Sequence, residues 1–474
     1  MNCKHFIIGI LLCFFAFSGK ASDEGLRIEI KAPQLKEKEL KLINYYNGSN
    51  YAQDTITLSK KGTGVFERET MFQEGLYIIY VDSTRFFDLL LGEDQTFTLS
   101  IDTSNFVEKN KIEGSIDSEA FMSYTQFLSK KQKERTELFN KYKELKEEEK
   151  EKKEKITTQL EELNTEVLAF QDHFFETHKD RWVGKFFKGL KPVTGPHPSP
   201  QNREEAVEQF KYLKYHYFDN IDLTDKRFWF TSYFPKSITG YMQSNVEFIP
   251  DSLAKAASWL VSQTMDDSIC FRLMLGKLFN YGATNEYMGM ENIWAKLAED
   301  YYLKGLVSNL DSAFLANVQS EYGKIQYNRI GMQAQNLQLQ DTTGNNINLY
   351  DIAGKYTLIY FYEPSCGHCK QTTPRIHEEL YKKYKDKGFS VACFYTLTDK
   401  DEWMKFINDH KLNDWNNVWD PERISYFWRF FDTSVTPGIY LMDEDKKIVA
   451  KKLDVESLDK YLSNALKDIE SETN

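Results

Sequence analysis

The sequence predicts a multidomain protein with an N-terminal antiparallel β-sandwich-like domain, an α-helical middle region and a C-terminal α/β domain. The chain has 474 residues, more than a single hydrophobic core usually serves. Its apolar residues alternate with polar ones from about Leu26 to Ile101, whereas they recur every three or four residues from about Ser118. From about Ile330 strand-like and helix-like segments alternate, which is typical of an α/β domain with a mixed sheet.

The first residues have the pattern of a secretory signal peptide. A short basic region is followed by an apolar run of twelve residues, Phe6–Phe17. Such a run is too short to cross a bilayer of about 30 Å as a helix. Small residues at Gly19 and Ala21 predict cleavage near Ala21, so we expect residues 1–21 to be removed and the chain to be exported.

Residues 22–115 are expected to form the β domain. The runs RIEI, ELKLI, DTITL, GLYIIYV and FTLSI alternate apolar and polar residues, and turn sequences such as NGSN and KGTG separate them. Short alternating runs between turn residues predict an antiparallel β domain, built as a small sandwich or an open barrel.

Residues 116–190 are expected to form long helices. No proline or glycine occurs from Glu119 to Lys179. The run KEEEKEKKEK, residues 146–155, carries both signs of charge and no apolar residue. We interpret it as a solvated stretch of helix or as the tip between two helices. After it, apolar residues form a heptad-like stripe, which makes a homodimer one expectation. The stripe consists of Ile156, Leu160, Leu163, Val167, Phe170 and Phe174.

Residues 191–329 are predicted to be a second helical region. The segment KPVTGPHPSP, residues 191–200, contains four prolines and marks a linker or a long loop. Helical patterns rich in aromatic residues follow, as in QFKYLKYHYF and KRFWFTSYF. In an acidic chain these aromatic side chains are expected to pack between helices rather than to stack on nucleic-acid bases.

The last segment, residues 330–474, has the element order of the predicted α/β domain. A hairpin with its turn at Gly344–Asn346 precedes an apolar strand, Tyr356–Tyr362. A helix follows and is predicted to end at Gly388. Asp399 is predicted to cap the next helix, and two further strands and a last amphipathic helix complete the segment.

Charge and cysteine content exclude two classes of protein. The net charge of -11 argues against a nucleic-acid partner, which requires a concentrated basic surface. Six cysteines are present, and four remain after signal removal, far too few for a disulfide-built scaffold. Of these, Cys270 and Cys393 lie in apolar patterns and are interpreted as buried, unreactive thiols. Lipidation of Cys13 is disfavoured because Leu12 stands where lipoprotein signals carry a small residue.

Cys366 and Cys369 form a local pair in the sequence FYEPSCGHCK, residues 361–370. A predicted strand ends just before the pair, and a predicted helix begins at its first member. Unpaired N–H groups and the dipole at a helix start stabilise a thiolate. Cys366 is therefore predicted to be the attacking sulfur. Cys369, one turn further inward, is predicted to resolve the mixed disulfide.

This segment, about residues 330–466, resembles the thioredoxin superfamily and, within it, the exported TlpA/ResA-like thiol-disulfide oxidoreductases. The resemblance rests on the hairpin before the first central strand, on FYEPSCGHCK, on Pro374 inside the first helix and on Val435-Thr436-Pro437. It implies that Pro437 is cis and faces the dithiol, and that Thr436 binds the substrate backbone.

The same resemblance implies an enzyme that exchanges disulfides with protein thiols in the bacterial periplasm or cell envelope. It implies a membrane or periplasmic electron donor, and we expect no cofactor, no metal and no nucleic acid. Residues 22–329 resemble the upstream modules common in such exported proteins. We expect them to provide substrate docking or dimerisation.

Two positions depart from the thioredoxin pattern. Tyr360 stands where thioredoxins usually carry a buried aspartate, six residues before the first cysteine, and Ser365 stands where they usually carry tryptophan. The proton acceptor for Cys369 must then be another group. Glu363 is the nearest carboxylate in the sequence and is the predicted substitute.

Gly367 and His368, between the cysteines, resemble the corresponding pair of protein disulfide isomerase. A partly charged imidazole here favours the Cys366 thiolate, which stabilises the reduced form and raises the reduction potential. The span between thioredoxin and that isomerase is roughly 90 mV, or about 4 kcal/mol. The pair therefore favours isomerisation or oxidation, although the direction of electron flow also depends on the donor.

Three other interpretations of the dithiol stay open. The first is metal binding: a zinc site requires four close ligands, of which only Cys366, Cys369 and His368 are local, whereas copper transfer through an exported dithiol stays open. A peroxidase of the peroxiredoxin kind shares the fold, with its cysteine in a different local context. The third alternative is a cell-envelope interaction or scaffold protein whose dithiol is structural.

Overall fold

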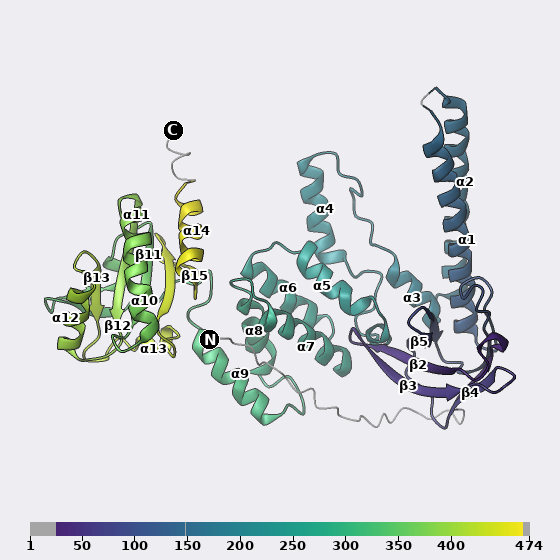
Figure 1. The fold of residues 1–474 in the computed structure, drawn as a ribbon, viewed down its shortest axis with the longest axis horizontal. Helices are drawn as coiled ribbons and strands as arrows, with labels where there is room; N and C mark the ends of the chain where they lie inside the picture. The colour runs from purple at the N-terminus through teal and green to yellow at the C-terminus, as the bar shows by residue number, and fades with distance from the viewer. Residues whose placement is uncertain (1–24, 147, 468–474) are drawn as a thin grey trace. The chain divides into compact units, whose positions relative to one another are not determined.

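The computed structural model describes residues 25–146 and 148–467. The predicted signal peptide, its cleavage near Ala21 and the question of lipidation at Cys13 lie outside the described residues. The chain divides into two compact units after Ile238, and each is described by itself. Figure 1 gives the order of the elements along the chain.

The first unit begins with two four-stranded sheets, of order β4-β1-β7-β8 and β3-β2-β5-β6. The strands are β1 (Leu26–Lys31), β2 (Glu39–Tyr46), β3 (Ser49–Thr57), β4 (Thr63–Arg68), β5 (Gly75–Asp82), β6 (Arg85–Leu91), β7 (Thr96–Ser100) and β8 (Lys111–Glu113). Alternate residues of both sheets, such as Ile28 on β1 and Leu42 on β2, are buried in one shared core. The arrangement is sandwich-like, because each sheet buries one face against the other.

One pair of strands departs from the predicted antiparallel arrangement. β1 and β7 are parallel, with Ile28 opposite Phe97, whereas the other described pairs of these sheets are antiparallel. The chain between β1 and β7 passes through the whole second sheet, and such a long connection permits parallel pairing. The prediction was wrong here because alternation of apolar residues indicates a strand but not the direction of its partner.

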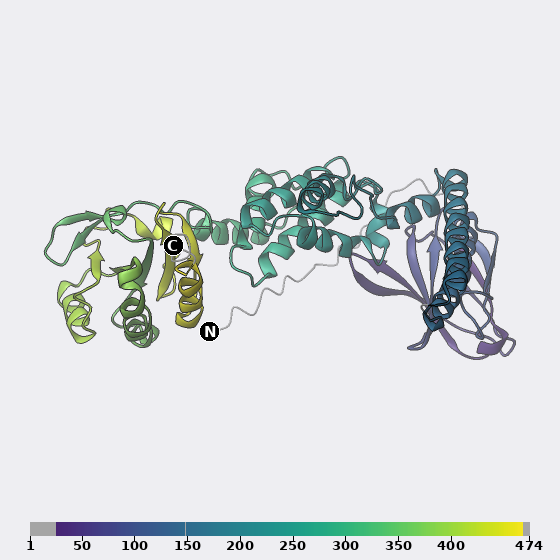
Figure 2. The ribbon, with the colours of Figure 1, turned by 90° about the horizontal axis from the view of Figure 1, so that it is seen from above.

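Two long helices follow, α1 (Ile116–Glu144) and α2 (Lys150–His178), and they lie side by side (Figures 1 and 2). The described residues of the charged run lie partly at the tip between the helices, at 146 and 148–149, and partly in the first turns of α2, where most are exposed, so both interpretations of that run are confirmed. The apolar stripe of α2 packs on α1. The ring of Phe170 lies 5.7 Å from that of Tyr124 and 3.8 Å from that of Phe127. Phe174 of the stripe is buried and its other members are partly exposed, and the homodimer stays a prediction.

The remaining helices before the seven-stranded sheet are α3 (Trp182–Leu190), α4 (Arg203–His216), α5 (Phe234–Ser244), α6 (Pro250–Ser262), α7 (Ser268–Thr284), α8 (Glu291–Leu297) and α9 (Ser312–Ile325). The proline-rich segment 191–200 forms neither helix nor strand, as predicted. In the second unit, α8 packs on α6 and α7. None of the helices formed by the described residues combines the length and apolar character that crossing a bilayer requires. The limits predicted for the domains, at residues 115, 190 and 329, stay predictions.

A seven-stranded sheet dominates the second unit, with the order β10-β9-β13-β12-β11-β14-β15. Its strands are β9 (Gln338–Asp341), β10 (Asn346–Asn348), β11 (Tyr356–Tyr362), β12 (Phe389–Tyr395), β13 (Asn416–Trp419), β14 (Gly438–Asp443) and β15 (Ile448–Lys451). β11 is parallel to β12 and antiparallel to β14, so the sheet is mixed, as predicted. β11 is buried from its second residue to its last.

Helices contribute to the hydrophobic core on both faces of this sheet. On one face lie α10 (Gly367–Arg375), α12 (Lys400–Asp409) and α14 (Val455–Ala465), and on the other lies α13 (Phe427–Phe430). The helical stretch that begins with α10 ends at Gly388, whose φ is 95°. Asp399 caps α12 by accepting a hydrogen bond from the main-chain N–H of Glu402. Both local predictions are confirmed.

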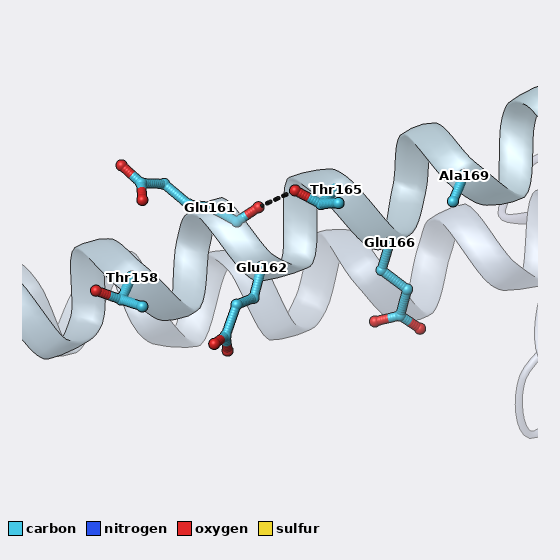
Figure 3. Close-up of a pocket in the computed structure, with 6 residues that line it drawn as sticks. All are labelled: Thr158, Glu161, Glu162, Thr165, Glu166 and Ala169. Atoms are coloured by element: carbon cyan, nitrogen blue, oxygen red, sulfur yellow. Dashed lines mark hydrogen bonds between the residues drawn. The ribbon is translucent and has the colours of Figure 1, made fainter.

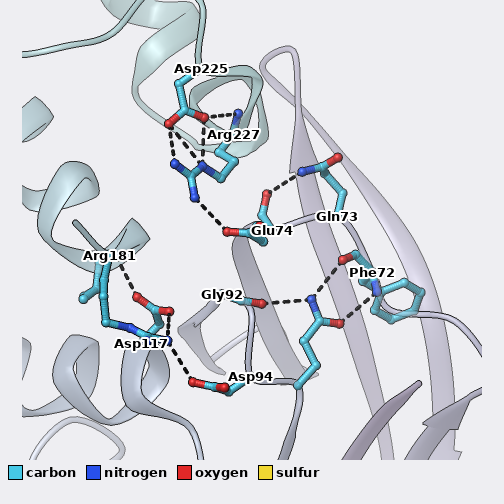
Figure 4. Close-up of polar contacts among 11 residues, drawn as sticks. Phe72, Gln73, Glu74, Gly92, Asp94, Asp117, Arg181, Asp225 and Arg227 are labelled. Carbon is cyan, nitrogen blue, oxygen red and sulfur yellow. Dashed lines mark hydrogen bonds and ion pairs between the residues drawn. The ribbon is translucent and has the colours of Figure 1, made fainter. Parts of the chain in front are cut away.

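Buried polar contacts join the helices of the first unit to its sheets (Figure 4). Asp117, in the first turn of α1, is 1% exposed. It accepts hydrogen bonds from the Arg181 guanidinium at 2.8 Å and from the main-chain N–H of Val183 at 3.0 Å. Arg181 also donates to Asp94, near the end of β6, at 2.8 Å. A buried carboxylate is tolerated here because a cation and a main-chain donor both satisfy it.

We therefore expect Asp117→Ala to destabilise the first unit by about 2–4 kcal/mol, because Arg181 and the Val183 N–H lose a buried acceptor. Hydrogen exchange of the intact chain should accelerate in peptides from α1 and α3 and stay unchanged in peptides from the second unit. Asp94→Ala removes the more exposed partner of the same guanidinium and should cost less than about 1 kcal/mol. Equal effects of the two substitutions would contradict this account.

Candidate active site

The cysteine pair lies directly after the central strand of the second unit. β11 ends at Tyr362, and Cys366 is the N-cap residue of α10. The Cys366 sulfur accepts a hydrogen bond from the main-chain N–H of Cys369 at 3.2 Å. An N-cap side chain normally supplies an oxygen to these unpaired N–H groups, and here a sulfur takes that place. Negative charge on this sulfur is therefore stabilised by the start of the helix.

Cys366 is partly exposed, and its thiol has a pKa below the ordinary value of 9.0. Partial burial acts in the opposite direction and raises the pKa, but hydrogen bonds outweigh it. These bonds come from the side chains of Cys369 and Thr436 and from the main-chain N–H groups of Cys369 and His368. A thiolate is thus favoured at a position that another molecule can reach.

Cys369 has the opposite properties. Its side chain is completely buried. Burial is the main cause that raises the pKa of this thiol to about 12, and the neighbouring Cys366 sulfur adds to the rise. The two sulfurs therefore differ both in access and in acidity, which is what an attacking thiol and a resolving thiol require.

A distant segment brings Thr436 to this pair. The carbonyl oxygen of Thr436 accepts a hydrogen bond from the Cys366 thiol at 3.3 Å, across 70 residues of sequence. The Thr436–Pro437 peptide bond is cis, as the resemblance implies, and both residues are partly exposed at the start of β14. The structure thus brings Thr436 and the dithiol together, and binding of a substrate backbone by Thr436 and Pro437 stays a prediction.

Tyr360 occupies the position of the expected buried aspartate and is itself completely buried. Its hydroxyl lies 2.9 Å from Thr373 Oγ1 and donates to the carbonyl oxygen of Cys369 at 3.4 Å. Burial, the largest cause, raises the pKa of Tyr360 far above its ordinary value. The hydroxyl therefore stays protonated, and it does not replace the aspartate as a proton acceptor.

Glu363 lies between β11 and the dithiol and contacts both cysteines through its main chain. Its carbonyl oxygen accepts from the N–H of Cys366 at 3.1 Å, and a main-chain hydrogen bond from Glu363 lowers the pKa of Cys369. Its carboxylate accepts from the hydroxyl of Thr396, just after β12, at 3.3 Å. The residue predicted to accept the proton of Cys369 is thus at the site, and its carboxylate is held by a neighbouring strand end.

Gly367 and His368 are both exposed at the start of α10. A side chain added at Gly367 would meet no other atom within 4 Å, so packing does not require glycine there. The main-chain N–H of His368 lowers the pKa of Cys366, while the residue as a whole is exposed. The predicted effect of the imidazole on the thiolate stays a prediction.

Cys270 and Cys393 are completely buried, which confirms that part of the sequence interpretation. Cys270 lies on α7, and Cys393 lies on β12 opposite Tyr360 of β11. Burial raises the pKa of the Cys393 thiol well above 9.0. Neither thiol is placed to meet a protein substrate.

Two threonines at the site were not predicted from the sequence. Thr373 bonds to Tyr360 and Thr396 bonds to Glu363. Thr373 follows Cys369 by four residues, so helical spacing places both on the same buried side of α10 and offers a signal that identifies it. Thr396 has no local signal, because it meets Glu363 only through the pairing of β11 with β12.

A shallow hollow in the first unit has a different chemistry. Figure 3 shows its lining residues along α2. They are Thr158, Glu161, Glu162, Thr165, Glu166 and Ala169. The hollow is acidic and contains no thiol or imidazole. Within residues 25–146 and 148–467, no group of three or more His, Cys, Asp or Glu side chains is arranged to hold a metal ion.

Known proteins resemble parts of this chain. A model described as the AhpC/TSA family matches residues 330–451. A thiol-disulfide oxidoreductase ResA of Bacillus thuringiensis is 30% identical over 128 residues, which are 26% of this chain and 68% of the relative. A solved domain of a possible thiol-disulfide isomerase from Cytophaga hutchinsonii is 36% identical, covering 30% of this chain and 96% of that chain with a TM-score of 0.28. A solved thioredoxin-like protein from Bacteroides caccae is 19% identical, covering 58% and 97% respectively, with a TM-score of 0.39.

The difference between the two thiols predicts how they react with an alkylating agent. In the native, reduced chain, iodoacetamide should modify Cys366 and leave Cys369 unmodified near neutral pH. Because the pKa of Cys366 is lowered, its rate should rise with pH through an inflection below 9.0. Cys369 should gain reactivity only as the pH approaches 12. Peptide mass spectrometry measures both rates, and equal labelling near neutral pH would be inconsistent with the geometry.

Proposed function

Because this chain belongs to the ResA-like thiol-disulfide oxidoreductases of the thioredoxin superfamily, we propose that it exchanges disulfides with protein thiols of the bacterial cell envelope through Cys366 and Cys369. The chain is an oxidoreductase with a thioredoxin-like redox function. The proposal adds the reacting sulfurs, the protein substrate and the compartment.

One observation carries the assignment of the reacting sulfurs. The pKa of Cys366 is lowered and that of Cys369 is raised to about 12, although the two residues lie within one helical turn. A structural pair of buried thiols has no need of this difference, whereas exchange requires one nucleophile and one protected thiol. The contact between Thr436 and Cys366 supports the proposal, because it brings the main chain of a residue proposed to bind substrate next to the Cys366 sulfur.

The exchange takes two steps that balance in electrons and protons. In the reducing direction, the Cys366 thiolate attacks one sulfur of a substrate disulfide, and the other substrate sulfur leaves as a thiolate. Cys369 then loses its proton and attacks the Cys366 sulfur, which releases the second substrate thiolate. The substrate disulfide gains two electrons and, after protonation, two protons, while Cys366 and Cys369 become a disulfide.

The second step needs a proton acceptor for Cys369, and we assign that role to Glu363. Burial holds the pKa of Cys369 near 12, so its proton must be removed in the step itself. Tyr360 stays protonated and cannot remove it. Glu363 is in main-chain contact with Cys369, and its carboxylate is anchored by Thr396. Rotation of the carboxylate away from Thr396 then provides a base close to the resolving thiol.

The sequence, rather than the geometry, bears on the redox character of the dithiol and on the location of the chain, while the direction of exchange also depends on the electron donor. Gly367 and His368 resemble the pair of a disulfide isomerase and favour a dithiol that is moderately oxidising. A membrane or periplasmic donor that supplies two electrons keeps such a dithiol reduced. The leader pattern of residues 1–21 supports a location in the periplasm or envelope. In this scheme residues 22–329 dock substrates or mediate dimerisation.

Reduction of insulin disulfides by dithiothreitol tests the activity itself. We expect the purified chain to accelerate insulin precipitation and Cys366→Ser to reduce the rate to the uncatalysed background, because serine does not form the mixed disulfide. Cys270→Ser serves as the matched control, since that thiol is completely buried on α7 and is not part of the cysteine pair, and should keep the activity. If Cys366→Ser reacts as fast as the parent, the chain is an interaction protein or a metal-handling dithiol instead.

Substitution of Glu363 tests the proton route. Glu363→Gln keeps the hydrogen bond from Thr396 possible but removes the base, so the turnover number should fall by at least about tenfold. The alkylation rate of Cys366 should change little, because Glu363 contacts that residue through its main chain. Single-turnover kinetics should show accumulation of the mixed disulfide. A full rate with no accumulation would exclude Glu363 as the acceptor.

A further inference from the structure

We infer that Asn328 is a positioning residue for the segment 427–436, the substrate loop, which carries Thr436 to Cys366. Asn328 connects this loop to the helical region that precedes the α/β domain. The inference rests on the proposed function, because it concerns access of a protein substrate to that dithiol. It gives the residues just before the α/β domain a role in the reaction.

Asn328 lies just after α9 and is 1% exposed. Its side-chain nitrogen donates to the carbonyl oxygen of Phe430 at 3.0 Å and to that of Lys324 at 2.7 Å. Its side-chain oxygen accepts from the ammonium group of Lys451 at 3.2 Å, and its main-chain oxygen accepts from the same group at 3.1 Å. The amide is therefore oriented by partners on both sides, with its nitrogen directed at α13.

Lys451 at the end of β15 makes this orientation unambiguous. Its side chain is 5% exposed and forms an ion pair of 2.9 Å with Glu291, the first residue of α8. A buried ammonium group offers donors only, so the Asn328 atom that faces it must be the oxygen. Since a buried cation is stable only when paired, Lys451, Glu291 and Asn328 hold the helical region against the sheet.

Phe430 lies six residues before Thr436, the residue that contacts the reacting thiol. It is the last residue of α13, and its ring lies 5.5 Å from that of Tyr327. Two residues later, the main-chain N–H of Asp432 donates to the hydroxyl of Tyr440 at 2.8 Å, and its carboxylate pairs with Lys452 at 3.2 Å. Thr436 follows, and its carbonyl oxygen meets the Cys366 thiol.

The loop is thus held at Phe430 by Asn328 and at Asp432 by Tyr440 and Lys452. The hydrogen bond from Asn328 to Phe430 crosses 102 residues of sequence, and the donor lies outside the strand-and-helix core of the α/β domain. Loss of this donor leaves the part-buried carbonyl oxygen of Phe430 without its partner and lets the segment move. A protein substrate that lies along Thr436 then binds less well, while a small disulfide that needs only the Cys366 sulfur is unaffected.

Two substitutions separate this role from a structural one. Asn328→Asp keeps an oxygen for Lys451 but removes the N–H donor to Phe430, and Asn328→Ala removes both. The same chemical change at an exposed position, Asn464→Asp on α14, controls for the added charge. Each full-length variant is compared in insulin reduction, with separate KM and kcat, and in its rate with the small aromatic disulfide of Ellman's reagent.

We expect both Asn328 variants to raise the KM for insulin by about five- to tenfold, in line with the loss of one hydrogen bond, with kcat changed by less than about twofold. Their rate with Ellman's reagent should equal that of the parent, and Asn464→Asp should match the parent in both assays. Equal losses with insulin and Ellman's reagent, or no change in the KM for insulin, would overturn the positioning role. A parent chain inactive with insulin would instead overturn the proposed function.

Discussion

The site depends on one constraint: the thiols of Cys366 and Cys369 differ in exposure and in pKa although they lie within one helical turn. The first turn of α10 donates its N–H groups to Cys366 and buries Cys369. Both effects require that β11 ends where it does, because a strand longer by one or two residues would move the helix start away from Cys366. The mixed sheet, with β12 and β14 on either side of β11, holds that strand end in place. Reactivity is thus a consequence of where a buried strand stops.

The chain manages the resolving proton without the buried aspartate typical of thioredoxins. A phenol at Tyr360 fills the core beside Cys369 and bonds to Thr373, so no charge is buried there. Leaving out a buried carboxylate avoids a large desolvation cost, but it also removes the obvious base. The proposed acceptor, Glu363, lies outside this buried core, since the residue is partly exposed and its carboxylate accepts a hydrogen bond from Thr396. The arrangement favours a resolving thiol that stays protected between encounters with substrate.

Buried charged groups in both units fix the positions of segments whose local sequence does not determine where they pack. In the first unit Asp117 joins the start of α1 to the residues before α3. In the second, Lys451 and Asn328 join β15 to the end of α9 and to α13. Such groups are costly to bury unless every donor and acceptor finds a partner, so they specify one arrangement among many that are equally apolar. The segment that carries Thr436 is held by contacts of this kind.

The sequence by itself determined the features with local signals. The strand before Cys366, the helix start at that residue, the helix end at Gly388 and the cap at Asp399 each depend on a few neighbouring residues, and all are present. Resemblance supplied Thr436, but only the structure shows its carbonyl oxygen 3.3 Å from the sulfur. The tertiary structure alone decided the parallel pairing of β1 with β7, the contact of Asn328 with α13 and the burial that raises the pKa of Cys369. Apolar periodicity predicts which residues of an element face inward, and capping residues predict where it begins. The partner of a strand and the degree of burial depend instead on the packing of the whole unit.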